Sequence, residues 1–127
     1  MKILWILGIL VCGAFAQSSL VRIMQNMEYA INLMEKGFLY NKREWIDEGL
    51  AELRVLNKEL RHIDPHTYLS VAQRRNINVV GGIVDRSAEN IEALDQYLKQ
   101  NEMIKSTNLY GRLLSGCMSC HAIVRGW

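Results

Sequence analysis

The chain of 127 residues is half hydrophobic and 22% charged, and it contains a single proline. A chain of this length suggests one domain that can bury a substantial core, and its composition argues against disorder and low complexity. The formal net charge of +2 is too small to indicate a protein that binds nucleic acid or an anionic membrane surface.

The amino-terminal segment MKILWILGILVCGAFA has the three parts of an export signal. Lys2 supplies the positive start, residues 3–11 the apolar segment, and residues 14–16 a small-x-small cleavage site. The apolar run is shorter than the about 20 residues that a membrane-spanning helix needs. We therefore expect export without stable insertion into a membrane.

Cleavage near Ala16 and Gln17 would leave a mature domain of residues 17–127 in the periplasm, with residues 1–16 as the signal peptide. An uncleaved anchor or a buried helix is the alternative for this segment. Cys12 resembles a lipoprotein cysteine only loosely, because a valine and not a small residue precedes it. Without the leader, the chain has 14 basic and 13 acidic residues, and it keeps two cysteines.

Hydrophobic side chains recur at steps of three and four along the remaining chain, which predicts helices. The first expected helix starts at residue 18 and ends near Gly37, since helices often stop at glycine. The second spans residues 42–62, with Asn41 as its cap and Glu44 completing a capping box. The two apolar stripes comprise Leu20, Met24, Met27, Ile31, Met34 and Phe38, and then Ile46, Leu50, Leu53, Leu56, Leu60 and Ile63.

The third expected helix covers residues 66–99, after a cap at Asp64 and a first-turn proline, Pro65. The Gly81-Gly82 pair inside it predicts a kink or a close contact with another helix. The fourth helix is expected at residues 106–125. The apolar stripes comprise Ile77, Val80, Val84, Ile91, Leu94 and Leu98, and then Leu109, Leu113, Cys117, Cys120, His121 and Val124.

No segment alternates between polar and apolar residues over a useful length, so we predict no strands. Four helices with short links favour an all-α fold, an antiparallel up-down-up-down four-helix bundle. The apolar stripes would then close on one common core.

The sequence Cys117-Met118-Ser119-Cys120-His121 is a C-x-x-C-H motif, the attachment signature of c-type haem. On a helix, the first, fourth and fifth positions of this motif lie on one face. Cys117 and Cys120 can therefore reach two vinyl groups of one porphyrin, while His121 places a ring nitrogen on the iron. The side chains of Met118 and Ser119 are expected to point away from this face. The motif predicts one covalently bound haem c.

Three other kinds of site use similar residues. A thioredoxin-like redox pair also has C-x-x-C, but it lies beside a βαβ pattern that this chain lacks. A structural zinc site needs about four nitrogen or sulfur ligands, and only His62 and His66 remain, for which surface or capping roles are expected. A disulfide between the two cysteines after export stays an alternative. The adjacent histidine and the export signal favour haem.

Because its haem motif lies close to the carboxyl end, the chain resembles the cytochrome c′ family and its low-spin relatives, the class II c-type cytochromes. Ordinary cytochrome c carries the motif near the amino end instead. The stretch from Cys117 to Arg125 is similar to the family's C-x-x-C-H-x-x-x-R, where Arg125 matches a basic residue near the proximal histidine. The resemblance implies a four-helix bundle with covalently bound haem, and it is compatible with a homodimer through the first two helices.

In that family, one residue of the first helix faces the iron. It is apolar in five-coordinate cytochrome c′ and a methionine ligand in the low-spin relatives. An antiparallel bundle places the start of the first helix beside the end of the fourth, which favours Met24 or Met27 over Met34. The resemblance thus implies iron ligation by His121 and a methionine, Met24 in preference to Met27, with Arg22 near a haem propionate. Core packing is the alternative role for each methionine.

A histidine and methionine ligand pair raises the potential of haem iron and leaves no open coordination site. We therefore expect electron transfer with periplasmic respiratory redox proteins, through weak and transient contacts. If no methionine reaches the iron, the alternative is binding of nitric oxide or carbon monoxide in an apolar pocket. We do not expect an enzyme, because the first-helix stripe has no histidine for acid–base catalysis.

Overall fold

A computed structural model describes the backbone of residues 3–126 and the side chains of residues 19–126. Within this part, the chain forms four α-helices and two short 3₁₀ helices, and no strand. The elements are α1 (Ile3–Tyr40), α2 (Arg43–Arg61), η1 (Pro65–Thr67), η2 (Val71–Asn76), α3 (Ile77–Lys99) and α4 (Met103–Arg125). The side chains of the predicted export signal and of its cleavage site lie outside the described residues.

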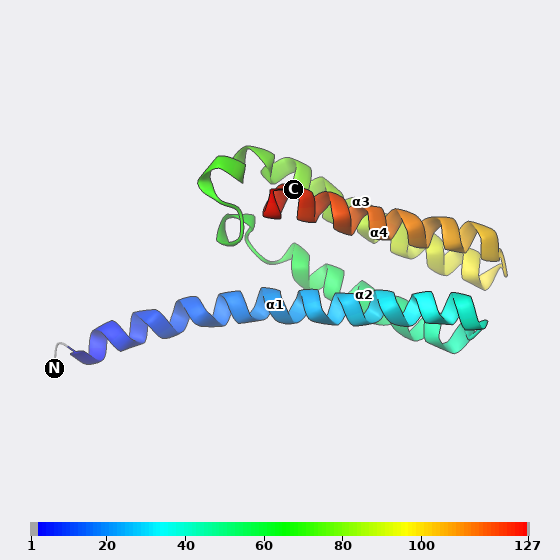
Figure 1. The fold of residues 1–127 in the computed structure, drawn as a ribbon, viewed down its shortest axis with the longest axis horizontal. Coiled ribbons are helices and arrows are strands. Elements are labelled where there is room, and N and C mark those ends of the chain that lie inside the picture. The colour runs from blue at the N-terminus through cyan, green and yellow to red at the C-terminus, as the bar shows by residue number, and fades with distance from the viewer. Residues whose placement is uncertain (1–2, 127) are drawn as a thin grey trace.

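The four α-helices are arranged as two antiparallel hairpins (Figure 1). Helix α1 packs against α2, α3 packs against α4, and α2 joins the two hairpins through its contacts with α3. Successive helices run up, down, up and down, and the carboxyl end of α4 lies close to η2. The prediction of an all-α chain with four helices is confirmed for the described residues. None of the described helices combines the length and the apolar character needed to cross a membrane.

The core draws on every α-helix, because each of them carries apolar residues at helical spacing. Most members of the predicted stripes are buried, and α1 adds Ile23 and Ala30, which widen its apolar face. The largest fully buried apolar side chains are Ile23, Met34, Ile46, Leu50, Leu56, Val80, Ile91, Leu94 and Leu98.

The turn between α1 and α2 corrects two predictions. Helix α1 continues past Gly37 to Tyr40, and Asn41 ends it in the left-handed conformation at φ 53°. Asparagine tolerates this conformation better than most residues. Lys42 and not Asn41 then stands at the N-cap of α2, without a side-chain hydrogen bond, so the capping box with Glu44 was wrong. Gly37 serves close packing instead, since a Cβ there would lie 2.6 Å from Cγ1 of Ile46.

The third helix begins later than its sequence signals suggest. Asp64 does cap a helix that has Pro65 in its first turn, and Oδ1 of Asp64 accepts a hydrogen bond of 2.9 Å from the His66 backbone. The helix that Asp64 caps is the three-residue 3₁₀ helix η1, however, and a second 3₁₀ helix, η2, follows with Ser70 at its N-cap. Helix α3 therefore starts at Ile77 and not at residue 66.

The glycine pair of α3 and the start of α4 also differ from the predictions. Helix α3 passes through Gly81 and Gly82 without a break, and no neighbouring helix approaches either glycine closely. The predicted close helix contact at this pair was wrong. Close approach occurs instead at Gly49, where a Cβ would lie 2.6 Å from the Ala30 carbonyl oxygen. Helix α4 starts at Met103, a little before the predicted position.

Candidate functional site

A cavity of about 260 Å³ that is partly open at the surface lies between the helices, with walls from all four α-helices. Its lining is mainly apolar: α2 contributes Leu53 and Leu60, α3 contributes Val84 and Ile91, and α4 contributes Leu113. Because its walls come from both hairpins, the cavity exists only where the α1–α2 and α3–α4 pairs face each other. Concave apolar cavities with a few polar groups are the usual form of cofactor sites.

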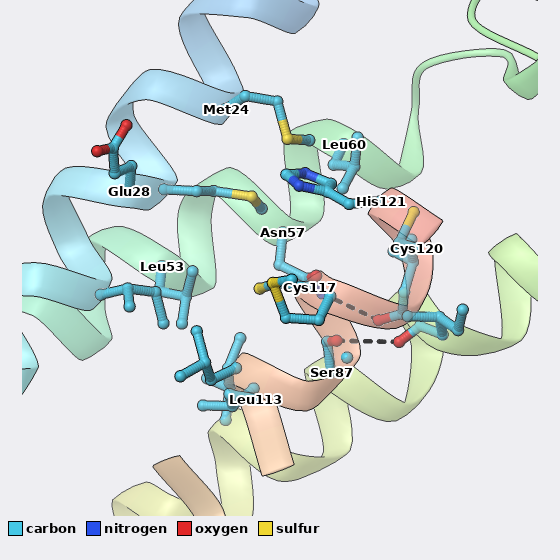
Figure 2. A pocket seen from close by; sticks show the side chains of 18 of the residues that line it. Met24, Glu28, Leu53, Asn57, Leu60, Ser87, Leu113, Cys117, Cys120 and His121 are labelled. Atoms are coloured by element: carbon cyan, nitrogen blue, oxygen red, sulfur yellow. Dashed lines mark hydrogen bonds between the residues drawn. The ribbon is translucent and has the colours of Figure 1, made fainter. Parts of the chain in front are cut away.

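The wall formed by α4 carries the whole C-x-x-C-H motif. Cys117, Cys120 and His121 all line the cavity, and each is partly buried. Both cysteines are free thiols. The helix continues to Arg125, so the spacing of the motif sets its three side chains along one helix face, as Figure 2 shows. Met118 also borders the cavity, contrary to expectation, although this residue is 45% exposed.

The opposite wall contains the two methionines that the sequence favours. Met24 and Met27 on α1 both line the cavity, and the Met24 side chain projects towards His121 (Figure 2). Met27 is buried and Met24 partly buried. Met34 is fully buried in the core and does not line the cavity.

The two arginines associated with the site lie outside the cavity lining. Arg125 is exposed at the end of α4, close enough for its charge to influence His121. Nη2 of Arg22 donates to Oε2 of Glu59 on α2 at 2.6 Å. Both groups are exposed, so this ion pair contributes little to stability. It links the middle of α1 to the end of α2.

Burial keeps the three motif side chains uncharged. It raises the pKa of the Cys117 thiol, and it raises the pKa of Cys120 with a smaller contribution from neighbouring Cys117. It lowers the pKa of His121, and the positive charge of Arg125 lowers it further. Near neutral pH, the wall therefore presents two thiols and a neutral imidazole, which is the form of histidine that binds metals.

Asn57 is a polar residue of the cavity that the sequence analysis did not single out. It is 6% exposed, and its Nδ2 donates to the Val84 carbonyl oxygen at 3.2 Å. Only the NH₂ group can donate to a carbonyl, which fixes the orientation of the amide. Its Oδ1 is thus left as an acceptor beside the cavity. An asparagine between Leu53 and Leu60 in an otherwise apolar stripe was the available sequence signal.

The other two histidines do not line the cavity. Nδ1 of His62 lies 2.7 Å from the Lys58 carbonyl oxygen, and Nδ1 of His66 lies 2.8 Å from Oδ1 of Asp64. Both are exposed, as expected for surface or capping roles. In the part of the chain that the structure describes, no group of three or more His, Cys, Asp or Glu side chains is placed to hold a metal ion.

Comparison of the chain with protein-family models, with curated protein sequences and with solved structures gave no significant match.

Proposed function

We propose that this chain is an exported mono-haem c-type cytochrome that transfers electrons. One observation carries the proposal: the C-x-x-C-H motif lines an apolar cavity inside a four-helix bundle, and two methionines line the same cavity from α1. The export signal in the sequence agrees with this function, because c-type haem is attached after export. The resemblance of the motif to that of class II c-type cytochromes points the same way.

The residues that line the cavity suit a haem in three respects. Its walls are mostly apolar, like the porphyrin faces, and they come from all four helices. Cys117 and Cys120 are free and protonated near neutral pH, so each can add its S–H across a vinyl group and form a thioether without loss of electrons. His121 on the same helix is neutral and can coordinate the iron.

A bound haem supplies one-electron chemistry at its iron, between the ferrous and ferric states. The chain's residues set the conditions for that chemistry. The apolar side chains of Leu53, Leu60 and Leu113 would keep water from the part of a haem that they cover, which limits reorganisation when the charge changes. Met24 would be the second residue to hold the iron, because its side chain projects towards His121. Periplasmic respiratory redox proteins would be the partners, in transient encounters.

The test is production of the full chain in a host with haem-attachment machinery. The purified protein should be coloured, should have the mass of the mature chain plus one haem, and should keep its haem after denaturation. The double variant Cys117→Ser/Cys120→Ser should lose covalent haem, while the matched control His62→Ala at an exposed position should keep it. A colourless protein at the bare polypeptide mass would contradict the proposal.

The same sample separates electron transfer from gas binding. A low-spin spectrum that carbon monoxide does not change supports ligation by a methionine. A high-spin spectrum that changes on addition of the gas would favour the five-coordinate alternative, in which nitric oxide or carbon monoxide binds on the methionine side.

A further inference from the structure

Gln73 connects η2 to the last turn of α4. Its Nε2 donates to the carbonyl oxygens of Ile123 at 2.8 Å and of Val124 at 3.0 Å. Its Oε1 accepts a hydrogen bond of 3.0 Å from the backbone N–H of Ser70, at the start of η2. The residue is partly buried, and one side chain thus bridges two backbone segments that are fifty residues apart.

These bonds complete the carboxyl end of α4. The last carbonyl groups of an α-helix have no partner within the helix. Here Gly126, in the left-handed conformation at φ 73°, donates its N–H to the Ala122 carbonyl oxygen at 3.0 Å. Gln73 then supplies donors to the next two carbonyls along the chain, Ile123 and Val124. The close position of η2 and this helix end is visible in Figure 1.

The chemistry of the bridge requires an amide. The side chain must offer an acceptor on one side and two N–H groups on the other, which glutamine provides and glutamate does not. The turn that it holds includes His121, whose ring lines the cavity. A loose last turn would let this imidazole leave the position from which it can coordinate a metal.

We propose that Gln73 is a positioning residue that fixes the His121-bearing turn of α4 against the cavity. The role of the fixed imidazole as an iron ligand depends on the function proposed above, whereas the fixing of the turn does not. Two hydrogen bonds from Gln73 hold the turn, and each contributes only modestly to stability. Removing them should therefore loosen the turn measurably without unfolding the bundle.

The test compares Gln73→Glu and Gln73→Met with the wild-type protein. Gln73→Glu keeps the length and the acceptor for Ser70 but removes both donors and places a charge against two carbonyl oxygens. Gln73→Met removes the polar groups without adding charge. The control Gln96→Glu makes the same chemical change at an exposed position of α3. Urea unfolding confirms that each variant is folded.

Hydrogen exchange of the amides in residues 120–126 is the first measurement. Both Gln73 variants should exchange at least about tenfold faster there than the wild-type protein, and Gln96→Glu should not. The haem-loaded variants should also contain a high-spin fraction that binds carbon monoxide, because His121 leaves the iron in part of the population.

Unchanged exchange in both Gln73 variants would overturn the proposal. Faster exchange with an unaltered haem spectrum would also overturn it, because Gln73 would then support only the helix end. If the wild-type chain acquires no haem, the function proposed above fails, but exchange at residues 120–126 still decides whether Gln73 holds the turn.

Discussion

Replacing each of the two cavity methionines of α1 by leucine should distinguish an iron ligand from a packing residue. Leucine removes the thioether sulfur but nearly conserves the volume. We expect Met24→Leu to convert a low-spin haem protein into a high-spin form that binds carbon monoxide. Met27→Leu should leave the spectrum unchanged. Met34→Leu is the matched control, because Met34 lies in the core and outside the cavity lining.

The burial of the three methionines explains the choice of leucine over alanine. Met27 and Met34 are 9% and 0% exposed, so truncation to alanine would cost about 2–5 kcal/mol and disturb the bundle. A change from methionine to leucine costs less than about 1.5 kcal/mol. Met24 is only partly buried, and its replacement should cost less still. A spectral change in Met24→Leu would therefore arise from the lost sulfur and not from unfolding.

The assay is the absorption spectrum of the oxidised and reduced proteins, with and without carbon monoxide, beside a urea titration of each variant. Low-spin spectra in both Met24→Leu and Met27→Leu would refute ligation by either methionine. A high-spin spectrum in Met27→Leu alone would identify Met27, about one helical turn further along α1, as the ligand in place of Met24.

Three further outcomes follow from the structure. Asn57→Leu removes an acceptor beside the cavity that favours ferric iron, so the midpoint potential should rise by about 20–60 mV in a redox titration; a fall would contradict this. Without haem, unfolded His121 keeps a pKa near 6.5 while burial lowers it in the fold. The unfolded state then binds more protons, so the free energy of unfolding in urea should fall as the pH drops below 6.5. His121→Leu should weaken this pH dependence. A free energy of unfolding that rises as the pH drops would refute the reasoning. Gly49→Ala should destabilise by about 1–3 kcal/mol, whereas Gly81→Ala, with open space around its Cβ, should stabilise by about 0.5–1 kcal/mol in thermal unfolding.

Hydrophobic spacing predicted the number of helices and most of the core, because burial of one face imposes the same period on every bundle helix. It failed at the turns, where one residue suits two roles. Asn41 can cap a following helix or end a preceding one, and the short link to Lys42 leaves only the second role. Ser70 and Gln73 have the spacing of a capping box. This signal could have predicted that a new helix, η2, begins after Ser70.

The cavity itself could be predicted only in part. Helical geometry places Cys117, Cys120 and His121 on one face, whatever the rest of the chain does. The contribution of Asn57 depends on the contact of α2 with α3, and that of Gln73 depends on where the irregular segment 62–76 crosses the end of α4. Such pairings join residues far apart in sequence, and no local pattern specifies them.

The unequal length of the links has a consequence for how the protein acquires its cavity. Within each hairpin, a tight turn at residues 41–42 or 100–102 brings two helices together, and such local contacts form with a small loss of loop entropy. The hairpins are joined by the longer segment 62–76, and the cavity needs walls from both. Contacts within each hairpin can therefore form at a lower entropy cost than contacts between the hairpins, and the cavity depends on the costlier set.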